Sequence, residues 1–112
     1  VPFSRSDIPK HVSLGHRVFV DVTADWCLTC KANKVLVLSR DPVAGALTAP
    51  DIIAMQADWT RPDPKIQRFL ESNDRFGIPF NIIYGPAAPE GIVLSEVLTQ
   101  DSIINALTQA AK

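Results

Sequence analysis

The two cysteines of the chain, Cys27 and Cys30, lie within one Cys-Leu-Thr-Cys motif. A thiol attacks a disulfide only as the thiolate, and a cysteine at the start of a helix gains from unpaired backbone N–H groups and the helix dipole. We therefore expect Cys27 to be the nucleophile that forms a mixed disulfide with a partner. Cys30, inside the first helical turn, would then attack Cys27 and release the reduced partner. The reverse order of steps oxidises a partner.

Two other uses of the cysteine pair stay open. A structural disulfide is one, although closing so short a loop yields only about 2 kcal/mol in the chain-entropy model. Metal binding is the other, because His11 and His16 lie upstream at His-x4-His spacing, which is compatible in number with a Cys2His2 zinc site. That order is unusual and an apolar strand would have to be spanned. Solvated loop histidines, and no metal, are therefore the favoured interpretation.

The segments around the motif predict that a strand gives way to a helix at the cysteines. Residues 17–24 read Arg-Val-Phe-Val-Asp-Val-Thr-Ala, which is typical of a strand covered on both faces. Asp21 interrupts this run, and its apolar neighbours favour burial over the alternative of a solvated strand end. Burial raises the pKa of a carboxyl group, so Asp21 is a candidate base for the Cys30 proton.

Beyond the cysteines, apolar spacing predicts one helical stripe, made of Ala32, Val35, Leu36 and Leu38. Asp41-Pro42 and Asp63-Pro64 each combine a capping side chain with proline, and they predict two further helix starts. Residues 51–57, between them, predict a second strand.

The last third of the chain predicts a hairpin followed by a helix. The apolar runs at residues 80–84 and 92–98 indicate two strands separated by a long turn over residues 85–91. Thr99 can cap a final helix. The order of elements predicts an α/β fold in which helices flank both faces of a mixed sheet. We expect a single domain with its core in residues 17–112, and an N-terminal extension or partial first element over residues 1–16.

Length and composition exclude several classes of protein. The chain has 112 residues, 46% of them hydrophobic, which suffices for one core. The net charge is -1 without a charged block, so nucleic acid is not an expected partner. No apolar run reaches the ~20 residues that cross a bilayer. The start Val-Pro-Phe is neither an initiator methionine nor a signal sequence, so we interpret the chain as a piece of a longer precursor.

The stretch from Val18 to Lys31 resembles the active-site strand and helix start of thioredoxin-like proteins. It is most similar to the C-terminal domain of the DsbD and ScsB group of bacterial transmembrane thiol–disulfide reductases. Gly77-Ile78-Pro79 matches the cis-proline loop of this family, and residues 84–99 resemble the tail of ScsB-like members. Together these matches cover most of residues 17–112, and they imply a thioredoxin-like fold.

The resemblance implies that Ile78-Pro79 is a cis peptide facing the dithiol, although residue types alone favour a trans bond at a strand start. The backbone at Ile78 would align a partner's disulfide over Cys27. Trp26 can pack beside the dithiol and offer an apolar contact surface, or it can be a core tryptophan. Leu28, between the cysteines, can touch partners if it is exposed.

Two charged positions complete the comparison with the family. Asp21 stands where thioredoxins carry a buried carboxylate beneath the second cysteine. DsbD-like domains often place an acidic residue four positions after that cysteine, where it helps raise the pKa of the nucleophile; here the position holds Lys34. Because a nearby cation favours the thiolate, we expect Cys27 to be more acidic than in those relatives.

The function that this resemblance implies is that of a protein-disulfide reductase in an electron relay. A periplasmic domain of an inner-membrane protein would receive electrons from a membrane-embedded dithiol domain of the same precursor and pass them to a periplasmic acceptor protein. The partners would meet it through transient mixed disulfides, with the cysteine pair as the redox group, no other cofactor, and the isolated domain monomeric. A free-standing thioredoxin, oxidase or isomerase is one alternative. A Cys/His metal-binding or copper-handling module is another.

Overall fold

The computed structural model describes residues 1–111, and at its centre lies a four-stranded mixed sheet in the order β2-β1-β3-β4. β1 (Arg17–Thr23) pairs in parallel with β2 (Ile52–Asp58) and antiparallel with β3 (Phe80–Gly85). β4 (Ala88–Val93) closes the far edge, antiparallel to β3. β1 is thus paired on both edges, which agrees with its nearly continuous apolar sequence.

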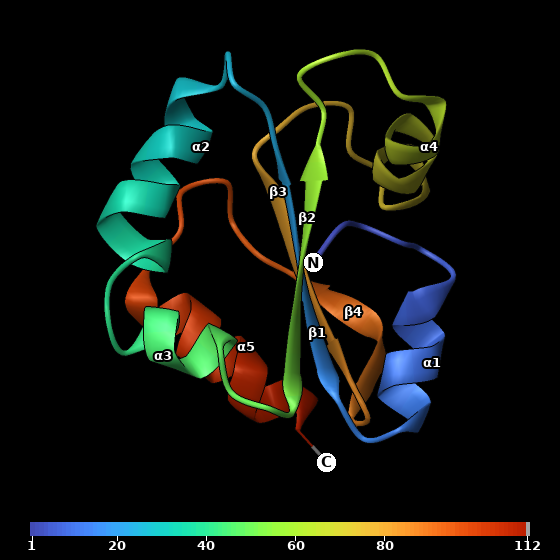
Figure 1. Ribbon diagram of the computed structural model, residues 1–112, viewed down its shortest axis with the longest axis vertical. Helices are drawn as coiled ribbons and strands as arrows, with labels where there is room; N and C mark the ends of the chain where they lie inside the picture. Colours follow the sequence, from blue (N-terminus) through green and yellow to red (C-terminus); the bar gives the residue numbers. More distant parts are fainter. Residues whose placement is uncertain (112) are drawn as a thin grey trace.

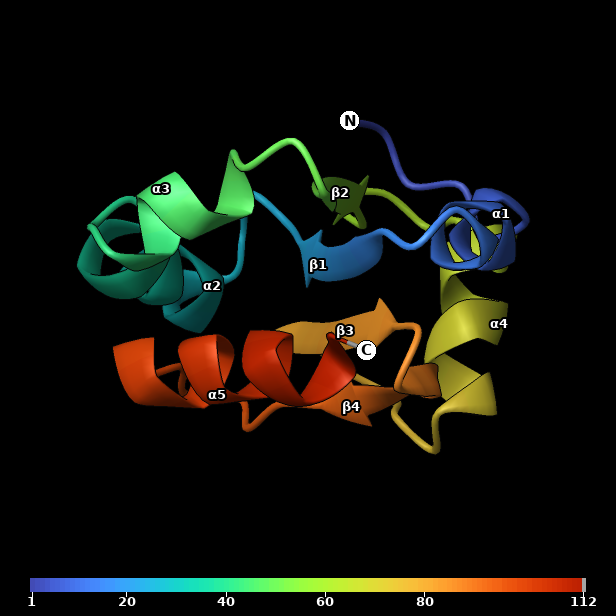
Figure 2. The ribbon, with the colours of Figure 1, turned by 90° about the horizontal axis from the view of Figure 1, so that it is seen from below.

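Helices cover both faces of the sheet, as the sequence predicts (Figures 1 and 2). α1 (Asp7–Ser13) and α4 (Pro64–Ser72) lie on one face. The other face carries the remaining helical segments, which are α2 (Leu28–Asn33), its π-helical continuation η1 (Lys34–Leu38), α3 (Val43–Leu47) and α5 (Gln100–Ala110).

Side chains of β1 alternate between these two faces, because successive residues of a strand point in opposite directions. Val18, Val20 and Val22 are fully buried in the core beneath α1 and α4. Phe19 packs on the other side, in the core formed with α3 and α5. Asp21 points to that same side, where it meets α2 instead of an apolar core.

The helix that follows the cysteines buries a different stripe from the predicted one. Val35 and Leu36 are 61% and 56% exposed, Ala32 is exposed as well, and only Leu38 is partly buried. The buried positions are Cys30, Asn33 and Val37. The prediction was wrong because it followed hydrophobicity alone, whereas the disulfide holds Cys30 inward and hydrogen bonds draw in the polar Asn33.

The prediction of a long turn in the hairpin was also wrong. Gly85 pairs directly with Ala88, so only Pro86 and Ala87 connect β3 to β4. β4 consequently ends at Val93, and residues 94–98 form a loop in which Leu94 and Leu98 are buried against the core. A short apolar run signals burial without specifying a strand, and here it belongs to a loop.

Helix starts follow the predicted capping signals. The Asp63 carboxylate accepts from the backbone N–H of Lys65 at 2.9 Å, at the start of α4. At α3 the predicted order is shifted by one residue: Pro42 is the N-cap, the helix begins at Val43, and the Asp41 carboxylate accepts from the N–H of Gly45 at 2.9 Å. At α5, Thr99 and Ser102 form a reciprocal capping box.

Residues 1–16 contribute to this fold more than the sequence indicates. Pro2 forms a parallel bridge beside Gln56 of β2, and the Phe3 N–H donates to the Gln56 carbonyl at 3.0 Å. Ile8 of α1 is 5% exposed and belongs to the core on that face. Among residues 1–111, no helix has the length and apolar character needed to span a membrane.

Replacing Thr99 by alanine tests the capping box. The Thr99→Ala variant leaves the Ser102 N–H without its acceptor, so we expect unfolding by urea to show a loss of about 1 kcal/mol. Thr108→Ala on the same helix is the matched control, because that hydroxyl only donates back to the Ile104 carbonyl. Equal effects of the two substitutions would contradict the prediction.

Candidate active site around the dithiol

The dithiol lies where β1 gives way to α2, as the sequence predicts. Cys27 is the N-cap of α2 and is joined to Cys30 by a disulfide, with the two Cα atoms 5.3 Å apart. The backbone N–H of Cys30 donates to Cys27 Sγ at 3.1 Å. After reduction, the same N–H and the positive end of the helix can stabilise a Cys27 thiolate.

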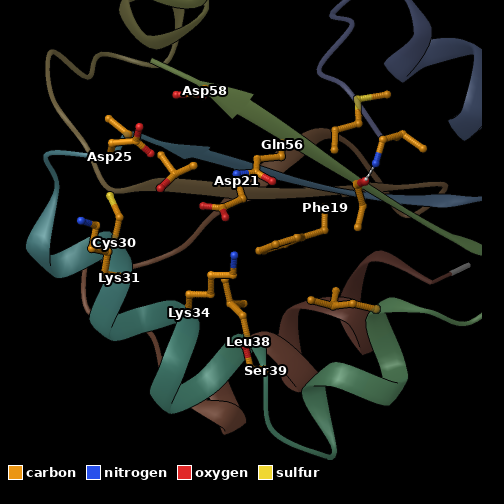
Figure 3. Close-up of a pocket in the computed structure, with 16 residues that line it drawn as sticks. Phe19, Asp21, Asp25, Cys30, Lys31, Lys34, Leu38, Ser39, Gln56 and Asp58 are labelled. Carbon is orange, nitrogen blue, oxygen red and sulfur yellow. Dashed lines mark hydrogen bonds between the residues drawn. The ribbon is translucent and has the colours of Figure 1, made fainter. Parts of the chain in front are cut away.

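Asp21 lines a pocket of about 420 Å³ that Cys30 and Lys34 also line (Figure 3). Its cross-strand partner on β3 is Asn81, which is buried and donates from Nδ2 to Asp21 Oδ1 at 2.8 Å. The side chain is partly buried and lines this pocket, so it is not a fully solvated strand end.

Opposing effects set the pKa of Asp21. Burial raises the pKa and is the largest effect, while the hydrogen bond from Asn81 and the positive charge of Lys34 lower it. The net result is a pKa above the ordinary aspartate value. A carboxylate with such a pKa can both accept and return a proton closer to neutral pH than an exposed aspartate can.

Lys34 lies near the candidate base, and its expected effect on the Cys27 thiol stays a prediction. It shares its pocket with Asp21 and Cys30, and Cys27 is not among the residues that line that pocket. Its positive charge lowers the pKa of Asp21.

The proline loop lies against the dithiol. The Ile78–Pro79 peptide bond is cis, and Ile78 packs on a small buried cluster that consists of Ala24, Cys27 and Cys30. The proline loop and the two cysteines therefore lie side by side.

Trp26 is a surface residue and not a core tryptophan, because 60% of it is exposed. Its indole Nε1 donates to the Thr60 carbonyl at 3.2 Å, and the N–H of Asp25 donates to Thr60 Oγ1 at 2.9 Å. The Thr60 N–H is itself bonded to an Asp58 carboxylate oxygen at 3.0 Å. These bonds tie the loop before the cysteines to the loop after β2.

Exposed apolar side chains surround the cysteines. Leu28 is 80% exposed between them, and Phe76 is 79% exposed on the loop that leads to Pro79. A groove of about 520 Å³ is lined by side chains that include Trp26, Trp59, Phe76 and Ile78. We call these four residues the aromatic groove.

Several residues of the site escaped sequence reasoning. Asn81 is the single amide in an otherwise apolar strand. A polar side chain in such a run was a signal in the sequence that could have identified it. Asn33 clamps α2 to the 94–98 loop, since its Nδ2 donates to the Glu96 carbonyl at 2.8 Å and its Oδ1 accepts from the Leu98 N–H at 3.0 Å. Thr60 and Phe76 carry no signal in sequence, because only the fold brings their loops to the dithiol.

The Cys2His2 alternative is wrong on geometric grounds. His11 and His16 precede β1 and the cysteines follow it, so seven strand residues, spanning about 23 Å at ~3.3 Å each, separate the two pairs. The histidine rings lie 6.0 Å apart at that far end. Residues 1–111 also bring together no group of three or more His, Cys, Asp or Glu side chains suited to hold a metal.

Comparison with known proteins agrees with this geometry. The thioredoxin-like family profile matches residues 9–86. The thiol:disulfide interchange protein DsbD of Ralstonia nicotianae is 33% identical over 82 residues, which is 70% of this chain. The chain spans only 13% of the length of that relative.

Solved structures share the fold. The oxidised C-terminal domain of DsbD from Neisseria meningitidis gives a TM-score of 0.75 at 21% identity, covering 98% of this chain and 99% of that one. A thioredoxin from Thermus thermophilus gives 0.68 at 20% identity, covering 96% of this chain and 82% of that one. The resemblance noted in the sequence is thereby confirmed: the chain belongs to the thioredoxin-like family.

Proposed function

We propose that the chain is a periplasmic thiol–disulfide oxidoreductase domain of an inner-membrane protein. It takes electrons from a membrane-embedded domain of the same protein and passes them to periplasmic acceptor proteins. One observation carries the proposal, namely a disulfide-bonded pair at the start of a helix, set against a cis-proline loop and ringed by exposed apolar side chains. The similarity to DsbD supports the relay role. In this role the domain acts as a monomer and needs no further cofactor.

The exchange follows from the positions of the two sulfurs. The Cys27 thiolate attacks the disulfide of an acceptor, one acceptor sulfur leaves as thiolate, and a mixed disulfide joins the two proteins. The Cys30 thiolate then attacks Cys27 Sγ, the bond to the acceptor breaks, and the acceptor leaves with both of its sulfurs reduced. The domain, now oxidised, is reduced again by the same two steps in reverse with its donor.

Asp21 is the base of the second step in this proposal. Cys30 must lose a proton before it can attack. Of the carboxyl groups that line its pocket, Asp21 is partly buried, whereas Asp25 and Asp58 are exposed. A water molecule in this pocket can carry the proton between Cys30 and Asp21. The raised pKa of Asp21 suits a group that takes up a proton and gives it back.

The aromatic groove and Leu28 form the docking surface in this proposal. A partner segment that pairs with the backbone at Ile78 lies over Cys27, with Pro79 holding the loop in place. Its apolar side chains can then bury Trp26 and Phe76, whose exposure is otherwise costly in water.

Replacing Cys30 by serine tests the relay directly. The Cys30→Ser variant cannot resolve the mixed disulfide, so we expect Cys27 to accumulate in a reductant-sensitive adduct with its partner, visible by non-reducing electrophoresis and identified by mass spectrometry. Cys27→Ser is the matched control and should capture nothing. If Cys30→Ser trapped no protein from a periplasmic extract or from the membrane-embedded domain, the proposed function would be wrong.

Replacing Asp21 by asparagine tests the base. Because asparagine accepts no proton, we expect release of the partner by Cys30 to slow at least about tenfold below neutral pH in stopped-flow measurements, while the first attack by Cys27 changes little. A normal second step in Asp21→Asn would remove Asp21 from the mechanism.

The Asp21→Asn variant should also change how the free energy of unfolding depends on pH, and the direction of that change can be predicted. Burial raises the Asp21 pKa above its unfolded value, so the folded chain keeps a proton that the unfolded chain has already lost, and this residue makes folding less favourable as pH rises through that interval. We therefore expect urea unfolding to show Asp21→Asn more stable than wild type at pH 7, with the difference shrinking as pH falls toward the unfolded aspartate value of ~3.9 and constant below it. The opposite sign would contradict the assigned pKa shift.

Replacing Phe76 by serine tests the docking surface. We expect Phe76→Ser to slow mixed-disulfide formation with a protein partner about tenfold, equivalent to ~1.4 kcal/mol, and to leave exchange with a small disulfide unchanged. Leu14→Ser is the matched control, since Leu14 is 72% exposed but follows α1, at the opposite end of β1 from the cysteines. An equal effect of Leu14→Ser would show that general surface polarity, and not the groove, sets the rate.

A further inference from the structure

Lys34 is a charged residue of the helical segment after the cysteines, and it faces the candidate base. It begins η1, the π-helical continuation of α2, and its side chain lines the pocket that holds Asp21 and Cys30. Figure 3 shows its amino group directed toward the Asp21 carboxylate from the helix side. Asn81 approaches the same carboxylate from β3, so the Asp21 carboxylate lies between a cation and an amide.

The other charged groups around this pocket come from several elements. Lys31 lies one turn earlier on α2, Asp25 precedes the cysteines, and Asp58 ends β2. The amino group of Val1 donates to the Ala54 carbonyl at 2.9 Å. The Asp58 carboxylate is occupied by the Thr60 N–H and hydroxyl. Of the cations in this set, Lys34 is the one whose charge acts on Asp21.

We propose that Lys34 is a positioning residue for the exchange reaction, because its ammonium group keeps the partly buried Asp21 carboxylate ionised until Cys30 must give up its proton. This inference rests on the proposed role of Asp21. Lys34 touches neither sulfur in the reaction, and it acts through the charge of the base.

The step that Lys34 supports is the second one of the exchange. In the mixed disulfide, the Cys30 thiol proton passes to the Asp21 carboxylate, and the thiolate attacks Cys27 Sγ. The Cys27–Cys30 bond forms, the bond from Cys27 to the partner sulfur breaks, and the partner leaves as thiolate. The proton then returns from Asp21 through the pocket to the partner or to water. Without the ammonium group, a larger fraction of Asp21 is already protonated and cannot start this step.

A small aromatic disulfide measures the step without any protein partner. Reduced chain treated with one equivalent of 5,5′-dithiobis(2-nitrobenzoic acid) forms an adduct at Cys27, and Cys30 then expels coloured thionitrobenzoate in a first-order phase. We expect Lys34→Gln to move the pH midpoint of this phase upward and to slow it about three- to tenfold on the acidic side, with the rates converging at high pH. Lys34→Arg should restore the wild-type profile, because it restores the charge.

Two further variants decide whether the effect runs through Asp21. Lys31→Gln, which removes a charge from the same pocket, should leave the midpoint in place. In an Asp21→Asn background, Lys34→Gln should cause no additional slowing, whereas an undiminished effect there would mean that Lys34 acts directly on Cys30. An unchanged midpoint in Lys34→Gln, or an equal shift in Lys31→Gln, would overturn the inference.

This test is independent of the proposed relay. Thionitrobenzoate release needs only the cysteine pair, so it proceeds whether or not a periplasmic partner exists. Failure of Cys30→Ser to trap a protein would refute the relay. The pH midpoint of Lys34→Gln would still test whether Lys34 acts on Asp21.

Discussion

The antiparallel register of β1 against β3 is the constraint on which the site depends. It sets Val22 opposite Phe80 and Asp21 opposite Asn81, so the proline loop just before β3 comes to lie beside the cysteines just after β1. A slip of one residue would turn every side chain of a strand to the other face. Asp21 would then enter an apolar core, and Asn81 would lose the carboxylate to which it donates.

The same register gives the two faces of β1 different roles: one face only packs in the core, and the other carries the candidate base. The face toward α1 and α4 is filled by valines and contributes burial alone. The face toward α2 combines Phe19, which anchors α3 and α5, with Asp21, which costs free energy to bury. One strand therefore supplies both the stability of the sheet and the destabilised group that the chemistry requires.

Local signals allowed much of this arrangement to be predicted from the sequence. The Cys-Leu-Thr-Cys motif after a β-branched run located the strand-to-helix transition, and Asp63 and Thr99 marked helix starts through short-range hydrogen bonds. Predictions failed where tertiary contacts decide the outcome. Asn33 is polar yet buried because the 94–98 loop satisfies its amide, and no hydrophobic pattern can indicate such a pairing.

The remaining parts of the site depend on contacts between distant segments. Thr60 joins the active-site loop through backbone and side-chain hydrogen bonds across more than thirty positions of sequence, and Phe76 reaches the groove only because α4 returns the chain to this end of the sheet. Neither residue type is diagnostic of a redox site. What identified them was the three-dimensional convergence of loops at the carboxyl end of β1.

The composition of the aromatic groove has an optical consequence. The chain contains two tryptophans, and both of them, Trp26 and Trp59, line this groove next to the disulfide. Intrinsic tryptophan fluorescence therefore comes from two residues that both line this groove, one of which, Trp59, also packs against the core. We therefore expect the emission of the protein to respond to anything that covers this groove.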